Sequence, residues 1–95
     1  MEKGGYLYIL TNRPDGTLYV GVTSNLPQRM AQHREGIFEG FTKKYGLKQL
    51  VYVERHDEIE MAITREKTIK GWRRAWKIRL ITAGNPDWQD LFHEL

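Results

Sequence analysis

The chain has 95 residues, of which 40% are hydrophobic, so it can form one small domain with one modest core and no separate recognition domain. It contains no cysteine, which excludes disulfide bonds and thiolate zinc sites, and its formal net charge of +3 does not by itself indicate a nucleic-acid partner. We expect a soluble cytoplasmic protein with no membrane partner, because the sequence lacks a signal-peptide pattern and a bilayer-length apolar run.

The first predicted elements are two β-strands joined by a turn. Residues 6–11 and 18–23 are rich in β-branched and aromatic side chains, which alternate between two faces in each run. Residues 12–16 between them read Asn-Arg-Pro-Asp-Gly, and proline and glycine favour the dihedral angles of a turn. The pattern predicts an antiparallel hairpin.

The register of this hairpin decides which side chains share a face. If Asn12 pairs with Thr17, Tyr8 lies opposite Gly21, whereas a slip of one residue would turn one strand over. In the first register, one face carries three tyrosines, which are Tyr6, Tyr8 and Tyr19.

A helix is expected to follow the hairpin. It should begin after Ser24 or Asn25, which are both favourable cap residues, and Pro27 is tolerated in its first turn. Gly36 should end this helix just after Glu35. The next connection carries two lysines and three aromatic side chains, which are Lys43, Lys44, Phe38, Phe41 and Tyr45.

A third strand and two further helices complete the expected fold. Residues 49–55 contain a continuous β-branched and aromatic run, which predicts a central strand. Asp57 is expected to cap a helix that Gly71 kinks or ends, and another helix should cover residues 73–82. The order β-β-α-β-α-α predicts an α/β (α+β) domain in which helices cover a three-stranded sheet.

The C-terminal residues differ in charge from the rest of the chain. Residues 80–95 carry three acids and no lysine or arginine. We expect residues 1–83 to form the domain. Residues 84–95 should form an acidic tail, with a short helix that packs on the domain through Trp88, Leu91 and Phe92.

Glu66 interrupts the apolar stripe of the helix after Asp57. The apolar members of this stripe are Ile59, Ala62, Ile63, Ile69 and Trp72. A carboxylate at such a position must be paired or bound to a cation, because burying it alone is costly. One interpretation is an ion pair with Lys70, four residues later. The other is a magnesium ligand, because Mg²⁺ often takes one or two protein carboxylates and keeps several waters.

Arg29 and His33 are four residues apart and therefore project from the same side of the first helix. An arginine can stabilise charge on a phosphate, and a histidine can transfer a proton near neutral pH. Each residue alone is also explained by an ordinary surface or packing role, and tyrosines are ordinary strand formers.

A basic block extends from Arg65 to Arg79, with seven basic residues and one acid. Such a block suits contacts with a nucleic-acid backbone, and it equally suits a solvated helix face. The candidate backbone contacts are Lys43, Lys44, Arg65, Lys70, Arg73, Arg74 and Lys77.

Taken together, these residues resemble the GIY-YIG endonuclease family. The resemblance covers roughly residues 4–80 and rests on Tyr6-Leu7-Tyr8, Leu18-Tyr19-Val20-Gly21, Asn25-Leu26, Arg29, His33 and Glu66. Two further segments, residues 40–45 and 69–72, are similar to the small stand-alone bacterial members of the family.

The resemblance implies a three-stranded antiparallel sheet flanked by helices, and an endonuclease that hydrolyses DNA phosphodiester bonds in DNA repair or recombination. Tyr8 and Tyr19 would be the motif tyrosines, with Tyr19 helping to activate the attacking water. Arg29 would stabilise charge on the phosphate. His33 would hydrogen-bond a tyrosine or relay a proton, and Glu66 would hold a single Mg²⁺ or Mn²⁺ ion.

The chain departs from the family pattern at two positions. Tyr6 stands where the first motif has glycine, with Gly5 just before it, and Ile78 stands roughly where catalytic members often carry asparagine. We also expect no attached DNA-binding domain, of the kind from which characterised nucleases of this family usually gain affinity and specificity. The resemblance therefore implies weak intrinsic binding to DNA, and room for a protein partner that supplies specificity.

Two other functions stay open at this point. The chain could be a nucleic-acid-binding or partner-binding module on the same fold that cuts nothing, since the basic block would serve that function equally well. It could also be an accessory subunit whose tail docks a larger repair enzyme through Trp88 and Phe92. DNA binding without cleavage would favour the first, and an exposed apolar tail would favour the second.

Overall fold

The computed structural model describes residues 4–36 and 40–95, apart from the side chain of Phe41. A three-stranded antiparallel sheet has the order β2-β1-β3, and its strands are β1 (Gly5–Thr11), β2 (Leu18–Thr23) and β3 (Gln49–His56). The helices are α1 (Leu26–Arg34), α2 (Phe41–Lys44), α3 (Ile59–Lys70), α4 (Arg74–Gly84) and the 3-10 helix η1 (Leu91–Glu94). The predicted antiparallel sheet flanked by helices is confirmed.

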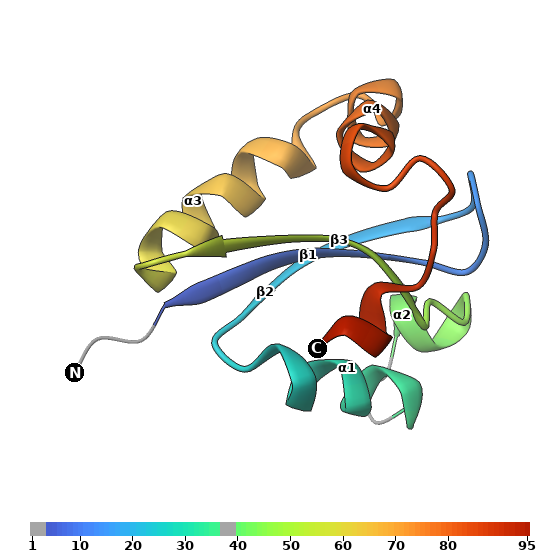
Figure 1. The fold of residues 1–95 in the computed structure, drawn as a ribbon, viewed down its shortest axis with the longest axis horizontal. Coiled ribbons are helices and arrows are strands. Elements are labelled where there is room, and N and C mark those ends of the chain that lie inside the picture. The colour runs from blue at the N-terminus through green and yellow to red at the C-terminus, as the bar shows by residue number, and fades with distance from the viewer. Residues whose placement is uncertain (1–3, 37–39) are drawn as a thin grey trace.

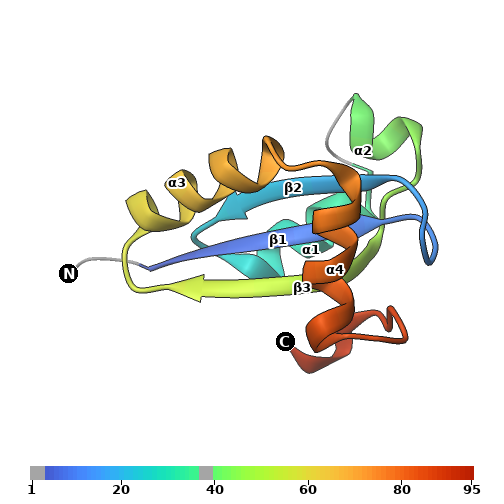
Figure 2. The same ribbon diagram turned by 90° about the horizontal axis from the view of Figure 1, so that it is seen from above.

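The helices divide between the two faces of the sheet. Helices α3 and α4 lie above the sheet, whereas α1, α2 and η1 lie below it (Figure 1). Seen from above, α4 crosses over the sheet and α3 runs along it near β2 (Figure 2). Side chains that point down from the sheet therefore meet α1, and those that point up meet α3 and α4.

The hairpin of β1 and β2 has the register predicted from its turn. Tyr8 is paired with Gly21, and the side chain of Asn12 accepts a hydrogen bond from the backbone N–H of Thr17 at 3.1 Å. The residues of β1 and β2 that point towards α1 include Tyr6, Tyr8 and Tyr19, so the predicted tyrosine face is confirmed.

The prediction that β3 is the central strand is wrong, because β1 occupies the centre and β3 lies at an edge. The C-terminal segment covers part of this edge. The backbone N–H of Leu50 donates to Asp90 at 3.2 Å, and the side-chain amide of Asn85 donates to the carbonyl of Val51 at 3.1 Å. The apolar run in β3 thus reflects burial under the tail, which a local pattern cannot distinguish from a central position.

The helix boundaries are close to those expected. Asn25 caps α1 through its side chain, and Gly36 follows this helix with a φ of 71°, a conformation that glycine adopts without strain. The predicted cap at Asp57 is wrong. Glu58 occupies the N-cap position of α3, and Asp57 pairs with Arg55 at 2.9 Å instead.

Two apolar clusters, one on each face, hold the helices to the sheet. The cluster under α3 and α4 contains Leu7, Ile9, Val20, Val51, Ile69, Ile81 and Trp88. The cluster above α1 contains Tyr8, Leu10, Leu26, Met30, Leu47 and Leu50, with Leu91 and Phe92 packed against it. Three apolar side chains of the tail therefore pack on the core of this chain, which counts against the tail as a docking segment.

None of the helices in residues 4–36 and 40–95 combines the length and hydropathy needed to span a bilayer.

Candidate active site

Tyr8 is the buried centre of a cluster on the α1 face. Its ring covers Gly21 so closely that a Cβ at residue 21 would lie 2.5 Å from the phenol oxygen and its carbon. The ring centroid of Tyr19 lies 6.3 Å from that of Tyr8. The glycine of the second tyrosine segment therefore provides the space that the tyrosine of the first segment occupies.

The Tyr8 hydroxyl contacts two side chains of α1. It lies 3.1 Å from Nε2 of His33, and Nη1 of Arg29 donates to it at 3.4 Å. The same Nη1 donates to the carbonyl of Val22 at 3.4 Å. Because a guanidinium can only donate, the phenol oxygen accepts from Arg29, and its own O–H donates to His33 when Nε2 carries no proton. Arg29 and His33, predicted to share one side of the helix, meet on this hydroxyl.

The pKa values of these groups favour that arrangement of protons. Burial raises the pKa of Tyr8 to about 12, although the neighbouring Arg29 opposes this rise. Burial, together with the positive charge of Arg29, lowers the pKa of His33 below 6.5. At neutral pH, Tyr8 is therefore protonated and His33 is neutral, as a hydrogen bond from the phenol to the imidazole requires.

The lowered pKa of His33 makes the stability of the fold depend on pH. Below the ordinary value of 6.5, unfolded His33 binds protons that folded His33 does not, so stability falls as pH drops through this value. We expect the Tm of the wild type to decrease from about pH 7.5 to pH 5.5, measured by thermal unfolding, and His33→Gln to flatten this decrease. Between pH 7.5 and pH 5.5, the carboxylates of Glu54 and Asp90 stay ionised, because the pKa of each is lowered from its ordinary value. These two groups therefore do not contribute to the decrease in Tm.

His93→Gln is the matched control for this pH series, because His93 is exposed. It should keep the wild-type dependence on pH. An unchanged dependence in His33→Gln would contradict the assignment of the effect to His33.

Tyr19 and Glu66 border the buried cluster from β2 and α3. Tyr19 is only partly buried, and its ring centroid lies 5.9 Å from that of His33. Glu66 is near enough for its charge to contribute to the raised pKa of Tyr8. Its carboxylate is 19% exposed and forms an ion pair with Nζ of Lys70 at 3.0 Å. Glu66 thus has a cation partner, Lys70, and also acts electrostatically on Tyr8, so both interpretations of this side chain stay open.

The side chains available as metal ligands suit a divalent ion that keeps most of its bound water molecules. Within the described parts of the chain, no three or more His, Cys, Asp and Glu side chains gather into a metal-binding group. A structural zinc site needs four protein ligands, whereas Mg²⁺ can be held by one carboxylate and several waters. Glu66 fits the second case, provided that the ion replaces the ammonium group of Lys70.

Three of the candidate backbone contacts bind groups of this chain. Nε of Arg65 donates to the carboxylate of Glu54 at 3.1 and 3.3 Å, and Lys70 pairs with Glu66. Arg74 donates to two carbonyls of the hairpin turn, those of residues 15 and 16, at 2.6 Å each. These side chains join the helices to the sheet, to the turn and to Glu66, so a DNA contact would compete with those roles.

The other four candidate backbone contacts are on α2, at Arg73 and on α4. Lys43 and Lys44 are exposed on α2, and Arg73 is exposed with its guanidinium 5.5 Å from the ring centroid of Trp76. Lys77 is partly buried on α4. Of the aromatic side chains expected near α2, Tyr45 is exposed, while Phe38 and the Phe41 side chain lie outside the described residues.

Two partners in the site were not among the candidate residues. Gly21 gives the space for the Tyr8 ring, and the carbonyl of Val22 anchors Arg29. The predicted register already places Gly21 opposite Tyr8, so this role could have been found from the sequence. A backbone carbonyl has no signature in the sequence, and its role needed the structure.

Gly21→Ala tests the close packing under Tyr8. The new Cβ would push against the phenol ring and separate Tyr8 from His33, so we expect a loss of about 1–3 kcal/mol in the free energy of unfolding. Denaturant unfolding measures this loss. Gly84→Ala is the control, since its Cβ would meet no described atom within 4 Å and alanine favours a helix by up to about 1 kcal/mol. Equal stability of Gly21→Ala and wild type would contradict the tight packing.

Comparison with known sequences supports a family assignment. The sequence profile described as the GIY-YIG catalytic domain matches residues 4–79. A UPF0213 protein of Natronomonas pharaonis is 40% identical over 81 residues, which is 85% of this chain and 94% of that protein. A UPF0213 protein of Staphylococcus saprophyticus is 37% identical over 79 residues, covering 83% and 95% of the two chains.

Comparison with solved structures agrees. The solution NMR structure of a UPF0213 protein from Bacillus halodurans matches with a TM-score of 0.59 and 26% sequence identity. The match covers 92% of each chain. The fold is therefore shared by these small proteins over nearly their whole length.

Proposed function

The chain belongs to the GIY-YIG catalytic domain family, and on that basis we propose that it is a metal-dependent endonuclease that hydrolyses DNA phosphodiester bonds. The observation that supports this most is the contact of the Tyr8 hydroxyl with both His33 and Arg29, next to Tyr19. A proton carrier, a fixed positive charge and a partly exposed phenol lie together on one face of the sheet.

In this proposal, Tyr19 rather than Tyr8 contacts the attacking water. Tyr8 is fully buried and burial raises its pKa to about 12, so it is a poor base and serves to hold the cluster together. Tyr19 is partly exposed on the same face. Neutral His33 accepts the Tyr8 proton in its hydrogen bond, which orients the phenol against Gly21.

Arg29 is proposed to bind the scissile phosphate. A guanidinium has five N–H donors in a planar fork, so one nitrogen can hold Tyr8 and Val22 while the fork binds phosphate oxygens. Its charge would oppose the negative charge that develops on the phosphate during attack. Glu66 would hold one Mg²⁺ or Mn²⁺ ion, which when bound supplies further positive charge to that phosphate.

DNA repair or recombination is the pathway we propose, with the cytoplasm as the location. Intrinsic DNA binding should be weak, because three of the candidate basic side chains already bind groups of this chain, and a protein partner would have to add specificity. Backbone contacts are assigned to Lys43, Lys44, Arg65, Lys70, Arg73, Arg74 and Lys77, and for Arg65, Lys70 and Arg74 a phosphate would replace the acceptors named above.

Incubation of the purified protein with supercoiled, nicked and branched DNA tests the proposal. We expect cleavage that requires Mg²⁺ or Mn²⁺ and that is lost when EDTA is added. Cleavage at the wild-type rate by both Glu66→Ala and Arg29→Ala would identify a contaminant. A folded wild type that cuts none of these substrates in either metal would overturn the proposal.

Two observations favour a second function, a DNA-binding module that does not cut. Lys70 neutralises the carboxylate that the metal needs, and Ile78 packs against the apolar cluster of α3 and α4 where catalytic relatives often have asparagine. Salt-dependent DNA binding without cleavage in any divalent ion would establish this function.

A further inference from the structure

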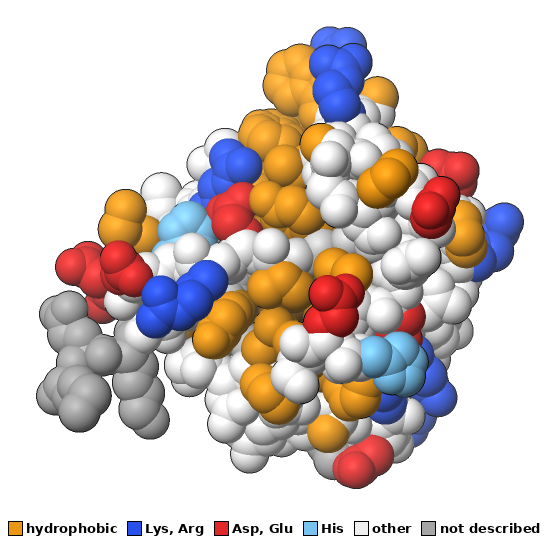
Figure 3. All heavy atoms as spheres, in the orientation of Figure 1, with side chains coloured by type: hydrophobic (Ala, Val, Ile, Leu, Met, Phe, Trp, Pro, Cys, Tyr) orange, Lys and Arg blue, Asp and Glu red, His pale blue; other side chains and the backbone are white. Residues whose placement is uncertain are grey.

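A groove on α4 lies outside the cluster around Tyr8 and has no role in the proposed cleavage. Its volume is about 350 Å³, and the residues that line it are Trp72, Trp76, Arg79, Leu80 and Ala83. Hydrophobic side chains gather in this upper region between α3 and α4, with Lys and Arg side chains next to them (Figure 3). The lining is thus an apolar floor with a basic rim.

The two indoles of the groove form one aromatic surface. Their ring centroids are 6.1 Å apart with an angle of 79° between the planes, and Trp76 is 46% exposed. Contiguous apolar surface with a polar rim is typical of binding sites on soluble proteins. The arrangement offers the face of one indole and the edge of the other to a flat apolar group.

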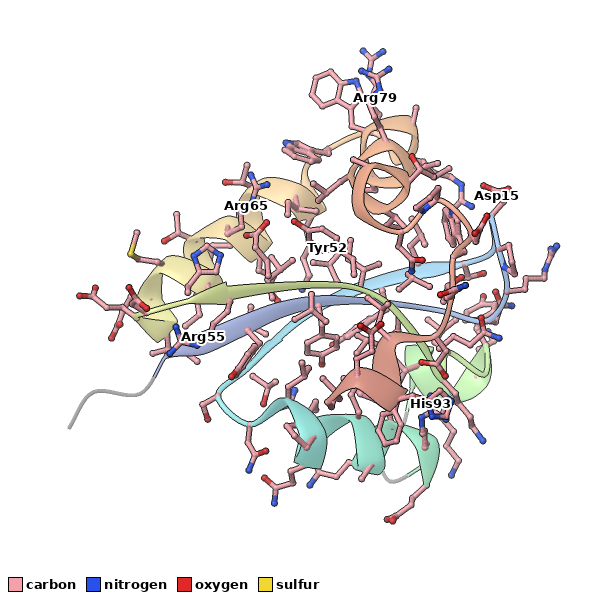
Figure 4. The ribbon with its side chains drawn as sticks, viewed as in Figure 1. Asp15, Tyr52, Arg55, Arg65, Arg79 and His93 are labelled. Carbon is pink, nitrogen blue, oxygen red and sulfur yellow. The ribbon has the colours of Figure 1, made fainter. Side chains whose placement is uncertain are left out.

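Guanidinium groups surround this aromatic surface. Arg65 lies 5.2 Å from the ring centroid of Trp72, and Arg73 lies 5.5 Å from that of Trp76. Arg79 projects from α4 at the top of the molecule (Figure 4). Helix α4 carries three basic residues and no acid. An anionic ligand with a flat apolar part matches this combination, whereas an apolar peptide would offer no acidic group to Arg73 and Arg79.

We propose that this groove binds an unpaired nucleobase of a DNA strand, stacked on Trp76, with the flanking phosphates held by Arg73 and Arg79. Aromatic side chains interleaved with basic ones bind single strands in this way, since each base has a π-face and each linkage carries a charge. A base within a duplex has its faces covered by its neighbours, so the ligand must be a strand end, a flap or a loop. The inference rests on the proposed function only in taking DNA as the ligand.

The groove begins on the segment that follows the candidate metal ligand. Lys70 is four positions after Glu66 in α3, and Trp72 is two positions after Lys70, so the Cα atoms of Glu66 and Trp72 are at most about 14 Å apart.

Binding measured without divalent ions, in EDTA, tests the proposal apart from cleavage. The probe is a fluorescently labelled oligothymidylate about eight nucleotides long, followed by anisotropy, and a hairpin duplex of the same charge is the comparison. We expect Trp76→Ala to weaken oligothymidylate binding at least about fivefold, and Trp76→Phe to retain most of it. The duplex should bind both variants as it binds wild type.

Met61→Ala is the matched control, because Met61 is a large exposed apolar residue on α3 outside the groove. It should bind the oligothymidylate as wild type does. Wild-type affinity in Trp76→Ala, or an equal loss for oligothymidylate and duplex, would overturn the proposed stacking. If Trp76→Ala weakens oligothymidylate binding but the wild type cuts no DNA, the proposed base-binding groove is supported and the proposed endonuclease activity is contradicted. If the wild type cuts DNA and Trp76→Ala binds the oligothymidylate as wild type does, the endonuclease activity is supported and the base-binding groove is contradicted.

Discussion

Glu66→Gln is expected to reduce divalent-dependent DNA cleavage at least about 100-fold while leaving the fold intact. The substitution keeps the shape of the side chain but removes the negative charge that would hold the metal, and several kcal/mol of charge stabilisation at the phosphate would be lost with it. The Glu66 side chain is 19% exposed and pairs with Lys70. The substitution removes this carboxylate and leaves no other buried carboxylate of the described residues without a partner, so the fold should persist. Single-turnover cleavage over a range of Mn²⁺ concentrations measures the loss.

Two controls on α3 separate a metal role from a general loss of charge. Glu60→Gln removes an exposed acid from the same helix and should cut at the wild-type rate. Lys70→Ala removes the competing ammonium group and should lower the Mn²⁺ concentration needed for half-maximal cleavage. Cleavage by Glu66→Gln at the wild-type rate would contradict the metal role. An unchanged metal requirement in Lys70→Ala would show that the ion pair does not compete with metal.

The hairpin and its tyrosine face were predictable because their signals are local. A turn of five residues sets the register, and the register alone determines that Tyr8 meets Gly21. The cap at Asn25 is equally local. The position of β3 is not local, because β3 pairs with β1 from much earlier in the sequence, and its edge is bound by Asn85 and Asp90 from much later. No pattern within 49–55 carries this information.

The sequence indicated which residues to consider for the candidate site, but it did not indicate which of them contact one another. Helical spacing places Arg29 and His33 on one side of α1, yet their meeting on one hydroxyl depends on how α1 crosses the sheet. The basic block from Arg65 to Arg79 is a second case in which the sequence did not indicate the contacts. Charge alone suggested that Arg65 and Arg74 contact DNA, whereas each binds acceptors in this chain. A count of charges cannot reveal which of them already have partners.

Arg29→Ala is expected to reduce cleavage about 100-fold to 1,000-fold, which is the usual effect of removing one donor that stabilises charge in a transition state. Arg29→Lys should fall between this variant and wild type, since it keeps the charge but loses the planar fork. Arg29 also holds the Tyr8 hydroxyl, so part of the loss could come from a displaced phenol. Single-turnover cleavage at saturating metal measures both variants.

Tyr8→Phe separates these two contributions. The ring remains over Gly21 and keeps the core filled, while the hydroxyl that joins Arg29 to His33 is lost. If Arg29 acts on the phosphate, Arg29→Ala should cost at least about tenfold more than Tyr8→Phe, because a donor to developing charge is missing only in the first variant. Equal losses would mean that Arg29 only orients the phenol, and the charge on the phosphate would then need another source, for which the exposed Lys43 and Lys44 are the next candidates.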